Sequence, residues 1–132
     1  MLRLVQSRRR VALELEERVR RELPHLPGAT ARDLARLVER LVAAFRPERV
    51  YVYGSQARGE ATPDSDVDLM LVVAASELPP HQRDQEARRA LGLHSLPIDV
   101  VVWTRDEFEA RALARASLPA TVQREGRTLY AA

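Results

Sequence analysis

The stretch YGSQARGEATPDSDVDLMLVV, residues 53–73, places three aspartates directly before an apolar run. Asp64, Asp66 and Asp68 stand at alternate positions, so their like charges repel one another. Partial burial in a strand makes each carboxylate harder to keep ionised. The sequence therefore predicts that another group compensates this negative charge.

The residues around this stretch are typical of two short strands. Residues 50–53 are β-branched or aromatic and stop at Gly54, and a second strand is predicted from about 66 to 73. Ten residues separate Ser55 from Asp66, which is short for a crossover helix. We therefore expect the two strands to be antiparallel neighbours.

The chain beyond this stretch alternates helical and strand patterns. It predicts a helix near residues 81–91, a strand at 98–103, a helix from Thr104 to about Ala116 and a short strand at 127–130. A right-handed crossover through the first of these helices would return the third strand parallel to the second. The pattern favours an α/β or α+β domain with a small mixed sheet flanked by helices.

Two helices are predicted before the first strand. Residues 2–23 carry an apolar stripe, PHLPG at 24–28 interrupts the pattern, and Thr30 with Asp33 resembles a capping box that opens a second helix. We interpret residues 1–28 as an N-terminal helical extension and residues 29–132 as the domain that carries the site. The stripe of the first helix suits packing on this domain and contact with a partner equally well.

Composition limits the function further. A chain of 132 residues is long enough for one domain, and the absence of cysteine excludes disulfides and thiolate metal sites. The net charge is +2 with acids and bases interleaved, so there is no strong signal for nucleic-acid binding. No signal peptide or long apolar run is evident, so we expect a cytoplasmic protein without a membrane segment.

Three carboxylates are predicted to converge. Asp66 and Asp68 fall on one face of the second strand because side chains alternate. The predicted crossover places Asp99, in the third strand, near the same end of the sheet. Three carboxylates without as many basic partners indicate divalent cations, and all-oxygen ligation suits Mg²⁺ or Mn²⁺.

The residues after the first strand suit a phosphate group. Gly54 lets the backbone approach closely, Ser55 offers a hydroxyl and free N–H groups, and Arg58 is about one turn further on. Together with the carboxylates, these residues indicate a site for a metal-bound nucleoside triphosphate.

At these positions the chain resembles a known superfamily. The letters GS, then ten residues, then DVD, with a later aspartate in PIDVVV, resemble the signature of the DNA polymerase β-like nucleotidyltransferases. Residues 53–73 are similar to the minimal nucleotidyltransferases, which carry a G-S-x-A-R-G run and often end in a pattern like REGRTLY. The resemblance covers Phe45 to about Tyr130 and implies the fold of that superfamily.

The resemblance also implies a two-metal nucleotidyl transfer. Asp66 and Asp68 would bridge two Mg²⁺ ions, and Asp99 would complete the ion that activates the attacking hydroxyl. The phosphates of ATP would contact the remaining candidates, Gly54, Ser55 and Arg58.

Family members of this size often pair with a helical HEPN-domain ribonuclease toxin and neutralise it by transferring AMP to a tyrosine hydroxyl. The resemblance therefore predicts an antitoxin that uses ATP and Mg²⁺. Two alternatives remain: transfer to a small molecule or an RNA end, and a non-catalytic antitoxin that inhibits its partner by binding. The sequence leaves homo- and hetero-oligomers equally open.

Overall fold

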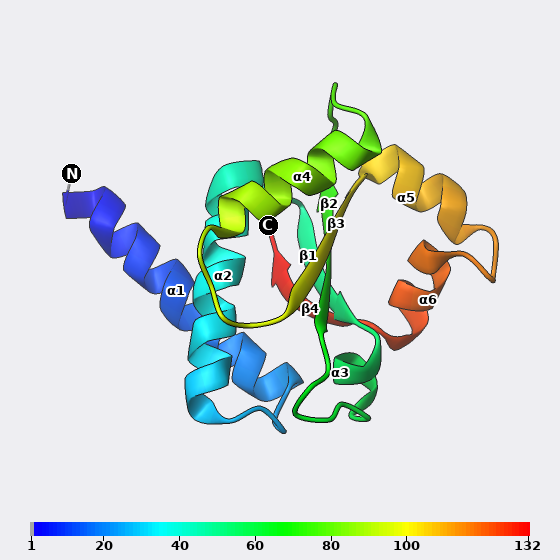
Figure 1. Cartoon of the computed structure of the whole chain (residues 1–132). Helices are drawn as coiled ribbons and strands as arrows, with labels where there is room; N and C mark the ends of the chain where they lie inside the picture. Colours follow the sequence, from blue (N-terminus) through cyan, green and yellow to red (C-terminus); the bar gives the residue numbers. More distant parts are fainter. Residues whose placement is uncertain (1) are drawn as a thin grey trace.

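The structure is a computed structural model that describes residues 2–132 (Figure 1). The elements in this range follow in the order α1 (Leu2–Glu22), α2 (Gly28–Phe45), β1 (Arg49–Tyr53), α3 (Ser55–Arg58), β2 (Val67–Val73), α4 (Pro80–Leu91), β3 (Ile98–Thr104), α5 (Arg105–Ala112), α6 (Leu118–Glu125) and β4 (Arg127–Ala131). The predicted α+β class, with a small mixed sheet flanked by helices, is confirmed.

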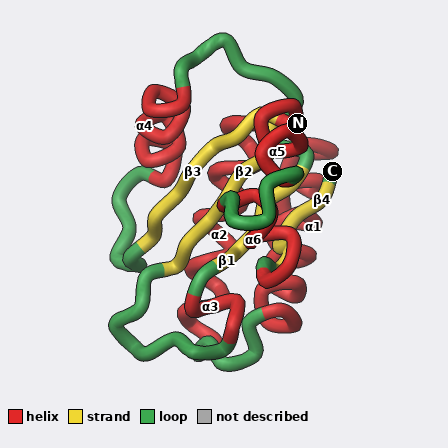
Figure 2. Tube along the Cα trace, turned by 90° about the vertical axis from the view of Figure 1, so that its right-hand side faces the viewer, coloured by secondary structure: helices red, strands yellow, loops and turns green. Residues whose placement is uncertain are grey.

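The four strands form one sheet in the order β3-β2-β1-β4 (Figure 2). β1 is antiparallel to both β2 and β4, while β3 is parallel to β2. The antiparallel first pair and the parallel return of the third strand both agree with the sequence prediction. Helix α4 makes the crossover between β2 and β3.

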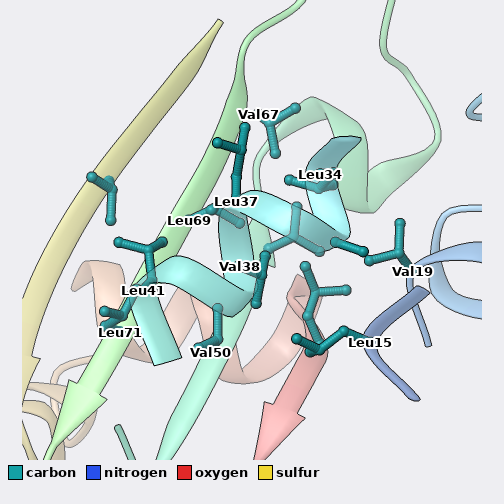
Figure 3. Close-up of a cluster of buried hydrophobic side chains, with 14 of the residues drawn as sticks. Leu15, Val19, Leu34, Leu37, Val38, Leu41, Val50, Val67, Leu69 and Leu71 are labelled. Atoms are coloured by element: carbon teal, nitrogen blue, oxygen red, sulfur yellow. The ribbon is translucent and has the colours of Figure 1, made fainter. Parts of the chain in front are cut away.

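Alternate residues of the strands pack on opposite faces of the sheet. One face, with α1, α2 and α4, holds the larger core, in which Leu34, Leu41 and Leu69 are fully buried (Figure 3). The other face holds a smaller cluster in which Met70 of β2 packs with Phe108 of α5 and residues of α6. One end of this second face carries the candidate site.

Helix α1 contributes directly to the larger core. Leu15, Val19 and Leu23 are buried there, and the Arg18 Nη1 donates a hydrogen bond to the carbonyl oxygen of Thr128 in β4 at 3.2 Å. The second half of α1 therefore packs on α2 and β4. The division into an extension at 1–28 and a domain at 29–132 stays a prediction.

One predicted helix start is wrong and another is confirmed. α2 begins at Gly28 after Pro27, without a side-chain cap, so Thr30 already lies inside the helix and does not cap it. The helix therefore starts three residues earlier than the hydroxyl pattern indicated, directly after a proline whose φ is fixed near the helical value. At α5 the predicted cap is present: Thr104 Oγ1 accepts from the Glu107 N–H at 3.2 Å, and Glu107 Oε1 accepts from the Thr104 N–H at 2.8 Å.

The helix predicted to end near Ala116 ends earlier, and a further helix that was not predicted follows it. α5 stops at Ala112, and α6 follows after Ser117, whose Oγ accepts a hydrogen bond from the Ala120 N–H at 3.2 Å. The signal was in the sequence, because serine followed by a proline within the first turn is typical of a helix start. α6 closes part of the second face of the sheet, which alters the surroundings of the candidate site.

An ion pair between the buried Arg83 and the partly exposed Glu107 joins α4, β3 and α5. Arg83 is 4% exposed and donates two hydrogen bonds to the Glu107 carboxylate, at 2.7 and 2.9 Å. It also donates to the carbonyl oxygen of Val102 at 3.1 Å, and Asp84 accepts from the Val102 N–H at 2.9 Å. The hydrogen bond from Arg83 is the main reason that the pKa of Glu107 falls to about 2.

Glu107→Gln tests this network through pH. The folded-state pKa lies below the ordinary value of 4.5, so the ionised carboxylate stabilises the fold above about pH 5, and this contribution is lost as the pH falls toward 2. We expect the substitution to lower the free energy of unfolding by about 1–3 kcal/mol at neutral pH. That difference should shrink steadily between about pH 5 and pH 2 in urea denaturation series. Glu109→Gln, two residues further on, is the control, and a pH-independent difference for Glu107→Gln would contradict the assignment.

Candidate active site

Two of the predicted carboxylates lie side by side in the sheet. Asp68 of β2 pairs directly with Asp99 of the parallel strand β3, as the crossover argument predicts, and Tyr53 of β1 is opposite Asp68 on its other side. Neighbouring strands are about 4.8 Å apart, so the two carboxylates lie within strong electrostatic range. Asp66 precedes β2, which begins at Val67. It therefore reaches this end of the sheet from a loop and not from within the strand.

The charge of this group is not balanced by neighbouring bases. The pKa of Asp68 is raised, first by burial and then by the negative charges of Asp99 and Asp66, while Arg58 opposes the shift. None of the ion pairs within residues 2–132 includes any of the three carboxylates. The site accordingly holds an excess of negative charge.

The donor chemistry fits a hard divalent cation, because carboxylate oxygens are the ligands that Mg²⁺ prefers. Within the described residues, however, no group of three or more histidine, cysteine, aspartate or glutamate side chains is arranged to hold a metal ion as it stands. Asp68 and Asp99 are brought together by the sheet, while Asp66 and Asp99 are exposed at its end. Ligation of metal by all three carboxylates stays a prediction.

Gly54 brings the end of β1 against Asp68. Its φ is +73°, a conformation that residues with a Cβ rarely adopt. A Cβ at this position would lie 2.4 Å from Asp68 Oδ2. The glycine is thus required both by the backbone and by the close approach of the carboxylate, and it leads directly into Ser55 at the start of α3.

Arg58 ends the single turn of α3 and makes contacts with acids. Its Nε donates to Glu60 Oε2 at 2.9 Å, and its Nη1 lies 3.6 Å from Glu125 Oε2. The hydrogen bond to Glu60 is the main cause that raises the pKa of Arg58. Glu60 is well exposed, yet it pairs with Arg58, so a phosphate at Arg58 has to compete with Glu60.

Sequence reasoning missed the role of Gln56. Its side chain is buried, with Oε1 at 2.7 Å from His25 Nε2 and Nε2 donating to the carbonyl oxygen of Ser65 at 3.4 Å. It therefore connects the turn between α1 and α2 with the loop that carries Asp66. No periodicity reveals such contacts, because both partners of Gln56 lie outside its own helical turn.

Tyr53 is the second residue of this site that the sequence did not single out as functional. Its pKa is raised to about 12, mainly by burial and then by the charges of Asp68, Asp99 and Asp84. Tyr53 consequently keeps its proton at physiological pH and places an O–H group near the carboxylates.

Comparison with known families agrees with this geometry. The profile of the family described as "Nucleotidyltransferase domain" matches residues 34–126, which include every candidate site residue. The chain belongs to this nucleotidyltransferase family. Helix α1 and strand β4 lie outside the matched range.

A solved structure shares the fold. The crystal structure of a candidate nucleotidyltransferase from Sulfolobus solfataricus is 24% identical in sequence, with a TM-score of 0.50, and the match covers 74% of this chain and 79% of that one. No curated protein matches the chain. The family identifies the protein as a transferase, and domains of this family generally use a nucleoside triphosphate with a divalent metal ion.

Within residues 2–132, no helix combines the length and the apolar character that crossing a membrane requires.

Gly54→Ala and Gly59→Ala form a matched pair. Both glycines have a φ above +70°, but a Cβ at Gly59 would meet nothing within 4 Å, whereas at Gly54 it would collide with Asp68. We expect each substitution to cost about 1 kcal/mol or more in unfolding free energy. Only Gly54→Ala should also weaken Mn²⁺-ATP binding, by about tenfold or more, in calorimetric titrations. Equal binding losses in the two variants would contradict a role for the contact with Asp68.

Asp68→Asn tests the uncompensated charge. Because the folded-state pKa of Asp68 is raised, protonation favours the folded state and the ionised form destabilises it. In buffer with a metal chelator at pH 7, we expect the variant to be more stable than the wild type by up to roughly 1 kcal/mol. The gain should fade as the pH is lowered toward 4 in thermal or urea unfolding. Asp64→Asn, in the exposed loop, serves as the control, and a destabilised Asp68→Asn would count against this interpretation.

Proposed function

We propose that this protein transfers AMP from ATP to a protein hydroxyl, a tyrosine of a cognate HEPN-domain ribonuclease toxin, and so acts as the antitoxin of the pair. The observation that carries the proposal is the pairing of Asp68 with Asp99 at the end of the sheet, with Gly54 pressed against Asp68. The family match supports nucleotidyl transfer, and the resemblance of residues 53–73 to minimal nucleotidyltransferases supports the finer assignment.

Each site residue has a role in the proposed reaction. Asp66, Asp68 and Asp99 would hold two Mg²⁺ ions, for which Mn²⁺ can substitute, and bound there the ions supply charge that stabilises the attacking and leaving oxygens of an in-line displacement. The phosphate side of ATP would lie against the backbone between β1 and α3, near Gly54 and Ser55. Arg58 would leave Glu60 to contact the phosphates.

The proposed reaction is a single displacement at the α-phosphorus of ATP. A bond forms between the tyrosine oxygen and the α-phosphorus of ATP, and the bond from that phosphorus to the bridging oxygen breaks, which releases pyrophosphate. The hydroxyl proton passes to a carboxylate of the site and from there to solvent. Asp99 suits this role because it is the exposed carboxylate that lies in a strand.

Exposure favours a macromolecular acceptor. Asp66 and Asp99 are exposed and only Asp68 is half-buried, so the hydroxyl does not have to enter a closed cavity to reach the carboxylates. A tyrosine on the surface of another protein meets this condition.

A second proposal is a non-catalytic antitoxin that inhibits its partner by contact. It is favoured by one observation, that no set of three ligands is assembled for a metal ion among the described residues. The same experiment separates the two proposals.

The experiment is co-expression with a HEPN-domain protein, sought first among the neighbouring reading frames, followed by intact mass spectrometry of that protein. We expect a gain of one or more AMP units with the wild type and with Asp64→Asn, and no gain with Asp66→Asn or Asp68→Asn. A gain that persists in both latter variants would show that the carboxylate mechanism is wrong. Neutralisation of the toxin without any mass change would support the binding proposal instead. AMP found on a small molecule or an RNA end would show that the acceptor is not a protein.

A further inference from the structure

A cavity of about 500 Å³ lies beside the edge strand β3, between α4, α5 and α6. Its apolar lining comes from Val101 and Trp103 of β3, Ala110 of α5 and Leu118 of α6. Its size falls within the range of small-ligand pockets in proteins. The helix α6, which sequence analysis did not predict, supplies one side of it.

The cavity continues the face of β3 that carries Asp99. Side chains alternate along a strand, so Asp99, Val101 and Trp103 point to the same face. With a rise of about 3.3 Å per residue, Val101 is roughly 6.6 Å beyond Asp99, and Trp103 is roughly 13 Å beyond it. Asp99 itself does not line the cavity, but a ring seated beside Val101 can extend its hydroxyl over this shorter distance to Asp99. Figure 2 shows this face of β3 between α4 on one side and α5 and α6 on the other.

In-line geometry assigns the cavity to the acceptor side of the site. The strand order is β3-β2-β1, and the backbone that would hold the leaving pyrophosphate follows β1 at Gly54 and Ser55. An attacking oxygen must approach phosphorus from the side opposite to the leaving group. The acceptor hydroxyl accordingly arrives from the β3 side, where the cavity lies.

The charge at the cavity favours an aromatic ring over a polycation. Glu107 is neutralised by Arg83, and Asp84 accepts a hydrogen bond from the Val102 N–H, while the rim also carries Arg111. The charges of Asp84 and Glu107 are offset by those of Arg83 and Arg111, so the cavity lacks the net negative charge that a cationic sugar such as an aminoglycoside would need. Trp103 and the aliphatic side chains suit a planar ring, which an indole binds by stacking or edge-to-face contact.

The edge of β3 is also unsuited to pairing with an incoming strand. Val102 uses its N–H with Asp84 and its carbonyl oxygen with Arg83. An acceptor segment is consequently recognised through a side chain inserted into the cavity and not through main-chain hydrogen bonds.

We propose that this cavity is the acceptor site: it holds the ring of a tyrosine of the partner protein, with the phenolic hydroxyl directed at Asp99. The inference rests on the proposed function and specifies where its substrate binds. It predicts that tyrosine is selected by the cavity and that aliphatic hydroxyls are poor acceptors.

Trp103 is the one tryptophan of the chain, so its fluorescence reports on the cavity directly. The probe is N-acetyl-L-tyrosinamide, with excitation at wavelengths that tyrosine does not absorb. We expect a saturable change with the wild type and binding weakened by about tenfold or more in Ala110→Phe, which fills the cavity. Ala44→Phe is the matched control and should bind like the wild type. Ala44 is exposed on α2, and this helix packs on the opposite face of the sheet. Thermal unfolding checks that both variants are folded.

Three results would overturn the inference: no saturable response, equal binding by wild type and Ala110→Phe, or saturation by adenosine where the tyrosine analogue has no effect.

A second measurement distinguishes a failure of the acceptor site from a failure of the proposed function. In the co-expression assay, Ala110→Phe should lose AMP transfer while it keeps Mn²⁺-ATP binding. Transfer that survives in Ala110→Phe refutes the acceptor site and leaves the proposed function intact. Binding of the probe by a wild type that transfers nothing refutes the function and leaves an aromatic-binding cavity.

Discussion

The parallel pairing of β3 with β2 decides what this molecule can bind. In that register Asp68 and Asp99 are direct neighbours, and the loop before β2 adds Asp66 at the same end of the sheet. Burial and like charges raise the pKa of Asp68, so the ionised group lowers the stability of the fold. Such unfavourable electrostatics are characteristic of functional sites, where stability is lower than the fold would otherwise allow.

Contacts outside the site keep these carboxylates in place. Arg83 and Asp84 of α4 both bond to Val102, which fixes β3 and therefore the position of Asp99 three residues earlier. At β1, the conformation of Gly54 leaves room for the Asp68 carboxylate. Gln56 completes the arrangement, because it connects the loop before Asp66 with the turn between α1 and α2. The N-terminal helices are thus physically linked to the candidate active site.

The sheet order also makes the site asymmetric. The turn that suits phosphate follows β1, the carboxylates lie on β2 and β3, and the apolar cavity lies beyond β3. A leaving group on one side and an acceptor on the other is the arrangement that in-line displacement needs. The Arg83–Glu107 pair also contributes to this asymmetry, because it neutralises charge beside the cavity.

The local patterns of the sequence determined the strands, the crossover that pairs β3 with β2, the cap at Thr104 and the glycine before α3, because each follows from residues close together in the chain. The start of α2 and the separate helix α6 were misjudged, although the proline and serine signals for both were local. Only the tertiary structure decided that Gln56 contacts His25 and that α6 closes a cavity against Trp103. These contacts join segments that are distant in the sequence, and the periodicity of apolar residues does not show which distant segments pack together.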